Sequence, residues 1–258
     1  MVGKELRRAC IQLEQLAARI STDLNRHARD TAPRIATLYI FAKGWKSYQA
    51  GKLLFKSGFW QDAATIGRTV LELGFQARWL KLDLPNRAEL LIRHELRDRR
   101  KLLRSLERSA STDVRDKAAV SLEELDTLLQ ATGAGNQAWQ NWWSEDGNVY
   151  KLAKDMGLAP VYDLLYRPLC WFVHSSPFGA DYYLREDGDH TAFDCRPGAP
   201  AVKDKGFVEM LLSSLPTGLI EVLAVVDTAY DLGRQSEFDQ IERAMRAFFT
   251  GNAYITPT

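Results

Sequence analysis

Two pairs of polar side chains have the spacing and chemistry of a candidate catalytic or anion-binding site. Arg68 and Glu72 are four residues apart in a segment whose apolar residues repeat with helical spacing, so both project from one side of a helix. They lie beside the apolar stripe, where an ionised pair needs a further polar partner. Arg167 and His174 are seven residues, or two helical turns, apart. We therefore expect all four side chains to converge between two packed helices, with His174 as the partner of Arg68 and Glu72.

The chemistry of these four residues suits metal-free cleavage of RNA. Histidine exchanges protons near neutral pH, arginines neutralise a phosphate, and a carboxylate can fix the imidazole tautomer. In this scheme the ribose 2'-hydroxyl attacks the adjacent phosphate, His174 acts as general base or acid, and Arg167 or Arg68 stabilises the developing charge. The sequence predicts no cofactor and no metal site. The alternative interpretation is a purely structural network of Arg, Glu and His that fixes the packing of two helices.

The elements that must position these residues are helices, because apolar residues recur at three- and four-residue spacings along nearly the whole chain. We predict an all-α, multi-helix bundle with one short β-hairpin near 181–195 and a single domain over 1–258. Pro168 is expected to kink or restart the helix that holds Arg167, and Pro216 to bend another. Helices are expected over residues 4–29, 34–55, 59–82, 85–107, 114–129, 161–174, 205–232 and 237–249. The core bundle is expected to comprise about 33–177 and 205–249, and the domain also includes an N-terminal helix over 4–29.

The composition is that of an ordinary globular protein and argues against global disorder. Of the 258 residues, 46% are hydrophobic and 26% are charged, and the formal net charge is +1. This charge gives no global electrostatic case for nucleic-acid binding. One local basic segment, RHELRDRRKLLRSLERS from Arg93, could bind a polyanion, and a solvated helix face with internal ion pairs is the alternative.

The cysteines and the apolar segments predict a cytoplasmic protein with no membrane partner. Cys10, Cys170 and Cys195 are far apart and form neither a zinc pattern nor a disulfide framework. The N-terminal residues mix charge into every turn, unlike a signal peptide. The apolar run LLSSLPTGLIEVLAVVD is interrupted by polar residues and Pro216, so we interpret it as a buried core helix.

Two segments resemble a widespread bacterial domain family of unknown function. The segments are LFKSGFWQDAATIGRTVLELGFQARWL and, about a hundred residues later, YDLLYRPLCWFVHSSP. The features that recur in that family are an Arg with a Glu four residues later, and a Tyr-led helix that ends in His before Ser and Pro. The resemblance covers about Lys46 to Pro177 and implies that Arg68, Glu72 and His174 form the polar core of the family.

More loosely, the chain is similar to HEPN helical bundles, many of which are metal-independent ribonucleases in toxin and phage-defence systems. Their motif is an Arg and a His separated by four to six residues, and six residues separate Arg167 from His174. Those ribonucleases usually place a polar residue directly after the Arg, whereas this chain has Pro168. The resemblance implies an RNA endonuclease that works as a homodimer with paired active sites.

Two other classes of function stay open on the sequence alone. One is a non-catalytic helical module that binds a partner protein in a bacterial stress or defence complex, in line with the near-neutral charge. The other is a ligand-sensing bundle that binds a nucleotide or another anion at Arg68.

Overall fold

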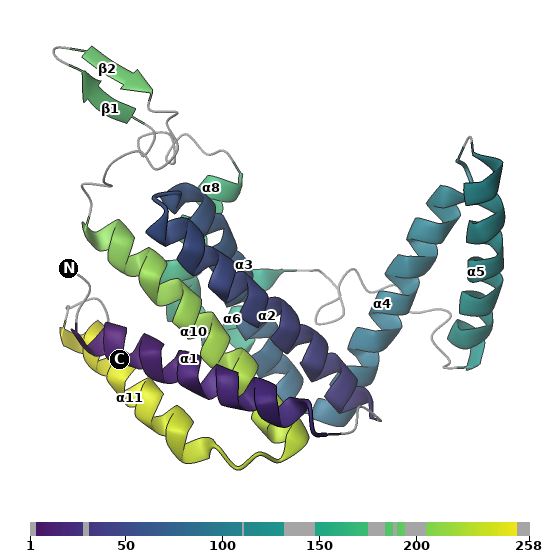
Figure 1. Ribbon diagram of the computed structural model, residues 1–258, viewed down its shortest axis with the longest axis horizontal. Coiled ribbons are helices and arrows are strands. Elements are labelled where there is room, and N and C mark those ends of the chain that lie inside the picture. The colour runs from purple at the N-terminus through teal and green to yellow at the C-terminus, as the bar shows by residue number, and fades with distance from the viewer. Residues whose placement is uncertain are drawn as a thin grey trace.

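In the computed structural model, the residues described are 4–27, 31–109, 111–131, 148–174, 184–187, 190–193 and 205–251, and they form an all-α architecture (Figure 1). Three helices pack together at its centre: α2 (Ala32–Lys56), α3 (Trp60–Lys81) and α10 (Lys205–Tyr230). On one side α1 (Lys4–Leu24) packs on α11 (Gln235–Gly251) and α10. The all-α prediction is confirmed, while the single domain over 1–258 stays a prediction.

Helix α1 forms because its apolar residues repeat on one face, which is fully buried as far as Leu24. The helix ends at Leu24, so the expected continuation to residue 29 is wrong. The physical reason is that Asn25, Arg26 and His27 are polar and exposed and so do not extend the apolar face, although the His27 ring lies 5.7 Å from that of Tyr230. The backbone instead turns, with the N–H of Arg26 donating to the carbonyl oxygen of Asp23 at 2.9 Å.

Helices α2 and α3 form an antiparallel pair joined by a tight turn. Pro33 lies in the first turn of α2, where its missing N–H costs nothing. Gly58 between the two helices has φ of 83°, a conformation that favours glycine, and it reverses the chain. The sequence predicted both helices to within two residues at each end.

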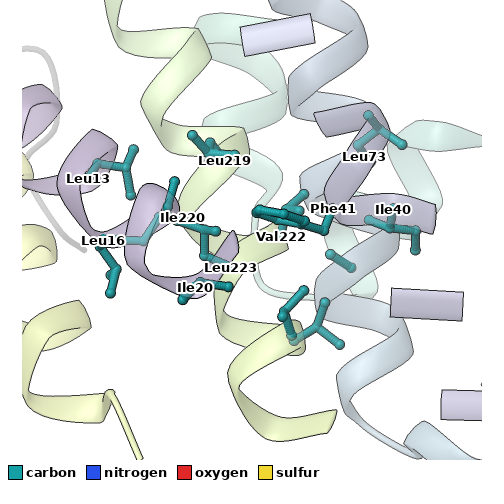
Figure 2. Close-up of a cluster of buried hydrophobic side chains, with 14 of the residues drawn as sticks. Leu13, Leu16, Ile20, Ile40, Phe41, Leu73, Leu219, Ile220, Val222 and Leu223 are labelled. Carbon is teal, nitrogen blue, oxygen red and sulfur yellow. The ribbon is translucent and has the colours of Figure 1, made fainter. Parts of the chain in front are cut away.

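Two hydrophobic cores share α3. The first lies between α1, α2, α3, α10 and α11, and Figure 2 shows its centre, where Phe41 of α2 lies beside Val222 of α10. The second lies between α3, α10 and the helices of residues 149–173. The residues of α3 divide between the cores, with Val70, Leu73, Ala77 and Leu80 in the first and Ala63, Ala64, Leu71 and Phe75 in the second.

The contact between α3 and α10 is unusually close at two glycines. A Cβ atom at Gly74 would lie 2.8 Å from the Cα of Gly218, and one at Gly218 would overlap the carbonyl oxygen of Val70. Only hydrogen atoms fit between the two backbones at this point. Helix α10 continues through Pro216, two residues before the contact.

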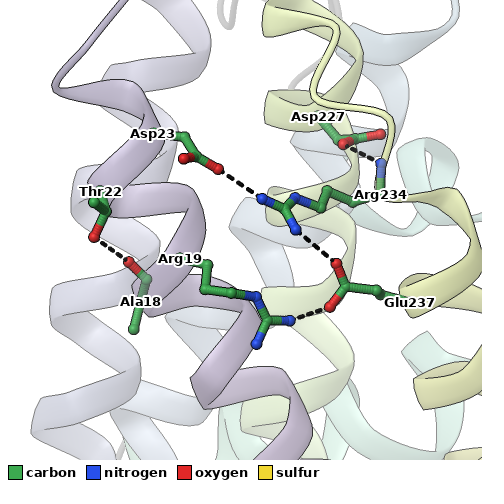
Figure 3. Close-up of polar contacts among 7 residues, drawn as sticks. All are labelled: Ala18, Arg19, Thr22, Asp23, Asp227, Arg234 and Glu237. Carbon is green, nitrogen blue, oxygen red and sulfur yellow. Dashed lines mark hydrogen bonds and ion pairs between the residues drawn. The ribbon is translucent and has the colours of Figure 1, made fainter.

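The layer of α1 and α11 is also tied together by charged side chains (Figure 3). Arg234, in the turn before α11, donates to Asp23 of α1 at 2.8 Å and to Glu237 at 3.0 Å. Glu237 also pairs with Arg19 of α1. These groups are partly exposed, so the network fixes orientation more than it adds stability.

Helix α10 is long and apolar enough to span a membrane over Gly206–Tyr230 by length and composition alone. Of its most apolar window, however, 67% is buried against the rest of the chain, as expected for the central helix of a globular core. This agrees with our interpretation of the apolar run as a buried core helix.

The helices α4 (Leu84–Leu106) and α5 (Thr112–Ala131) form an antiparallel hairpin that projects from the bundle (Figure 1). Leu84, Ala88 and Leu91 anchor the first half of α4 in the first core. In the described part of the chain, the second half packs on α5 through a small cluster of four leucines, Leu96, Leu103, Leu125 and Leu129. We call α4 from Leu96 onward, together with α5, the arm.

A two-stranded antiparallel sheet precedes α10. It pairs β1 (Leu184–Asp187) with β2 (His190–Phe193), with Leu184 opposite Phe193 and Asp187 opposite His190. The other residues of the hairpin predicted near 181–195 lie outside the described part of the chain.

Candidate functional site

Helix α3 presents Arg68 and Glu72 on the side that faces residues 162–174. The guanidinium Nη2 of Arg68 lies 3.5 Å from Oε2 of Glu72, and the two side chains are 22% and 24% exposed. The spacing of four residues places the pair on one side of the helix, as the sequence predicted. Because the pair is mostly shielded from water, both groups need further partners.

Tyr166 supplies the partner of Glu72. Its hydroxyl donates to Oε2 of Glu72 at 3.0 Å, and its ring lies 5.0 Å from the guanidinium carbon of Arg68. Burial, reinforced by the neighbouring Glu72 carboxylate, raises the pKa of Tyr166 well above its usual range, so the phenol stays protonated and remains a donor. The sequence analysis had assigned this role to His174.

Cys170 supplies the partner of Arg68. The Nε of Arg68 donates to its Sγ at 3.3 Å. Burial lowers the pKa of Arg68, but the charge on Glu72, the Tyr166 hydroxyl and the bond to Cys170 raise it more, so the guanidinium stays charged. Tyr166 and Cys170 are four residues apart, like Arg68 and Glu72 on the opposite helix. This matching spacing was the signal that sequence reasoning missed.

A π-helical turn places Tyr166 and Cys170 in register with α3. After the short α7 (Ala159–Val161), residues Tyr162–Tyr166 form the π-turn η1, and α8 (Arg167–Val173) follows. The N–H of Arg167 donates to the carbonyl of Tyr162, five residues earlier. Pro168 explains this wider turn, because proline has no N–H and its ring would clash with the carbonyl four residues before it.

The irregular turn ends before Arg167, so Pro168 does not separate Arg167 from His174. Pro168 occupies the first turn of α8, and His174 is its C-cap, with its N–H donating to the carbonyl of Cys170 at 3.0 Å. Seven residues of regular α-helix therefore join the two predicted site residues, about 10 Å apart along the axis. Both lie on one side of α8, as the sequence analysis expected for an unbroken helix.

The side chain of Arg167 is exposed and turned toward the preceding turn. Its Nη2 lies 2.9 Å from Oδ1 of Asp163, and its guanidinium carbon lies 5.5 Å from the centre of the Tyr162 ring. The Arg167 and Asp163 side chains are 58% and 45% exposed, so this ion pair is weak and a stronger anion could replace it.

His174 is exposed at the end of α8. Four residues along an α-helix correspond to a rotation of about 40°, so His174 lies close to the direction of Cys170, the residue that Arg68 contacts. Along one side of α8 there are therefore an exposed imidazole at the end of the helix, Arg68 of α3 against Cys170 one turn earlier, and the exposed Arg167 a further turn back. Such a surface can bind an anion and exchange a proton with it.

A second polar cluster lies between α1 and α2. The Tyr48 hydroxyl donates to Oε1 of Glu14 at 2.8 Å, and Lys52 pairs with the same carboxylate. Burial, together with the Glu14 charge, raises the pKa of the adjacent Cys10 thiol to about 11. A protonated thiol is a poor nucleophile, so this cluster is a structural network.

The fold and the site define an all-helical bundle protein in which a shielded Arg, Glu and Tyr cluster supports a helix ending in histidine. The chain belongs to DUF5677, a family of unknown function, whose model matches residues 34–191. This range includes Arg68, Glu72, Arg167 and His174, and it confirms membership of a helical family of unknown function. No curated protein and no solved structure matches the chain. None of these comparisons supports the looser similarity to HEPN bundles.

Proposed function

We propose that the protein is a metal-independent RNA endonuclease whose active site is the side of α8 that holds His174 and Arg167, with Arg68 behind it. The observation that supports this most directly is the unbroken helix from Arg167 to His174, which leaves a cation and an imidazole exposed on one side. The HEPN-like reaction requires this combination. A cytoplasmic location and a homodimer belong to the same proposal.

In the proposed reaction His174 removes the proton of the 2'-hydroxyl, whose oxygen attacks the adjacent phosphorus. The bond from phosphorus to the 5'-oxygen breaks, and that oxygen takes a proton from water or a protonated histidine. The products are a 2',3'-cyclic phosphate and a 5'-hydroxyl. Arg167 exchanges Asp163 for the phosphate oxygens, and Arg68 adds positive charge behind them. Glu72 and Tyr166 hold Arg68 in place.

The test is cleavage of tRNA and total RNA by purified protein in the presence of EDTA. We expect His174→Ala to lower the rate by at least about 100-fold, the usual contribution of a general acid or base. His94→Ala on α4 is the matched histidine control and should leave the rate unchanged. An RNA with a 2'-deoxy substitution at the cleaved position should resist the wild-type protein. Equal activity of wild type and His174→Ala would exclude this function.

A non-catalytic interaction module is the second candidate function. It is favoured by apolar side chains that the arm leaves in solvent, of which Leu102 is 59% and Val120 is 61% exposed. In this case the Arg68 cluster only joins α3 to α8. Ligand sensing is a variant of this candidate, and a nucleotide panel in thermal unfolding tests it. A rise in melting temperature that is lost in Arg68→Lys would support sensing, and no shift with any nucleotide would argue against it.

A further inference from the structure

In the arm, α5 packs along the outer half of α4 and supports it away from the bundle (Figure 1). Figure 1 shows the hairpin extending from the end of α3, with α5 beside the outer half of α4. Arg100 of α4 donates to Oδ2 of Asp126 on α5 at 3.0 Å, beside the leucine cluster that joins the two helices. The base of α4 is fixed by its buried leucines and by Arg87, whose guanidinium carbon lies 4.2 Å from the centre of the Trp79 ring. The side chains of this helix are therefore presented on a firm support.

Four cations form a row, three along the outer half of α4 and the fourth in the turn that follows it. Arg97, Lys101, Arg104 and Arg108 follow one another at spacings of four, three and four residues. We call these four residues the basic row. Such spacing places side chains on one side of a helix, about a quarter of a turn from the side that faces α5. Lys101, Arg104 and Arg108 are exposed, so the row faces solvent.

The positive charge is local to this helix. Helix α4 has seven Lys or Arg side chains against three Asp or Glu, whereas α5 has two against five. The whole chain has a net charge of only +1. Within the row, Lys101 pairs with Asp98, whose Oδ1 lies 2.9 Å from its Nζ. Both groups of that pair are exposed, so it is weak and a polyanion can displace it.

The geometry of the basic row matches a sugar-phosphate backbone. Along α4 its cations are spaced by about 4.5 to 6 Å, and the helix from Arg97 to Arg104 extends about 10 Å, with Arg108 in the turn beyond. A nucleic-acid strand presents one phosphate for roughly every 3.4 Å of axis, so the row spans several phosphates of one strand. A membrane surface fits less well, because membrane-binding helices place large apolar residues next to their cations. On α4 the exposed Leu102 and Leu106 lie on the opposite side from the row.

We propose that the basic row binds the phosphodiester backbone of RNA and holds the substrate while α8 acts on it. The choice of RNA rests on the proposed function, whereas the binding itself rests on the charge and spacing of α4. Binding of this kind is independent of base sequence and strongly dependent on salt.

The experiment measures the affinity of a fluorescent single-stranded RNA by anisotropy between 50 and 300 mM salt, in a His174→Ala background that prevents cleavage. The test variant adds Lys101→Gln, Arg104→Gln and Arg108→Gln. We expect affinity near 150 mM salt to fall by at least about 10-fold, and the slope of log affinity against log salt to decrease by about 2, from three lost phosphate contacts.

The matched control removes the same charge from exposed cations of α1 and α2, through Arg7→Gln, Arg8→Gln and Lys43→Gln. This control should retain both affinity and slope. Equal weakening of both variants, or no weakening of the test variant, would overturn the proposal. The proposal would also be overturned if RNA does not bind and the basic row is instead required for binding to vesicles of mixed neutral and anionic phospholipids.

The two proposals fail separately. If His174→Ala abolishes cleavage but the row variant binds RNA normally, only the role of the arm is wrong. If the row variant loses RNA but His174→Ala cleaves like wild type, only the catalytic assignment is wrong. Circular dichroism of each variant establishes that it is folded.

Discussion

Among the described residues, the Tyr166 hydroxyl is the neutral hydrogen-bond donor to the shielded carboxylate of Glu72. Tyr166→Phe removes that donor but keeps the ring beneath Arg68. We expect the free energy of unfolding to fall by about 1 to 3 kcal/mol, because a carboxylate with little access to water loses a partner. Urea unfolding measures the change, and Tyr39→Phe, at a tyrosine that is 53% exposed, is the control. An unchanged midpoint for Tyr166→Phe would mean that water replaces the hydroxyl at no cost.

Cys10 gives a residue-scale prediction that depends on pH. Its pKa of about 11 is raised by burial, so iodoacetamide at pH 8 should modify it about 100-fold more slowly than an unfolded thiol, in proportion to thiolate. A raised pKa stabilises the folded protein below the pKa of the unfolded thiol, and this contribution is lost as pH rises through about 11. Mass spectrometry of alkylated peptides between pH 7 and 11 follows the reaction. Equally fast modification in buffer and in urea would contradict burial of the thiol.

The sequence could predict the polar residues that share a helix but not those that meet across the fold. Arg68 with Glu72, and Arg167 with His174, follow from helical geometry alone. Tyr166 and Cys170 are 94 and 102 residues from the groups they contact, so their role depends on how α8 packs on α3. The sequence does not show how the two helices pack, so we predicted His174, a polar residue at the end of the second helix, as the partner of Arg68 and Glu72.

At the scale of elements, the helices were predictable because each has its own apolar stripe, and the π-turn was not. A proline inside a helical pattern is compatible with a kink, a break or a wider turn. The choice of a π-turn here also brings Tyr166 toward Glu72, a contact outside the local sequence. Helix α6 (Val149–Asp155) was missed as well, since seven residues are too few for a clear period.

Gly218 gives an element-scale prediction about the distance between α3 and α10. A methyl group there would overlap backbone atoms of Val70, so Gly218→Ala must push the helices apart. We expect a loss of about 3 kcal/mol in urea unfolding, despite the better helix propensity of alanine. The matched change is Gly44→Ala, where the nearest atom is a side-chain methyl of Val222 at 3.3 Å that can move. A variant Gly218→Ala as stable as Gly44→Ala would show that the backbone contact is looser than described.

At the scale of the whole molecule, α3 lies where the two cores meet. Like α10, it contributes residues to both cores, and it also presents Arg68 and Glu72 to α8. The sequence did not predict burial of α3 on two sides. A helix that is buried on one side and a helix that is buried on two can show the same main apolar stripe.

This double burial has a consequence for how the chain can change over generations. A substitution at a buried position of α3 must fit the core around it, and at Gly74 a larger side chain would also collide with the backbone of α10. Most substitutions at these positions therefore destabilise the fold. The two charged residues of its shielded side are the exceptions, since neither core requires them. Replacing Arg68 and Glu72 together by apolar residues would be the easiest such change for the fold to absorb. Retention of the pair in relatives would therefore measure selection for what the site does.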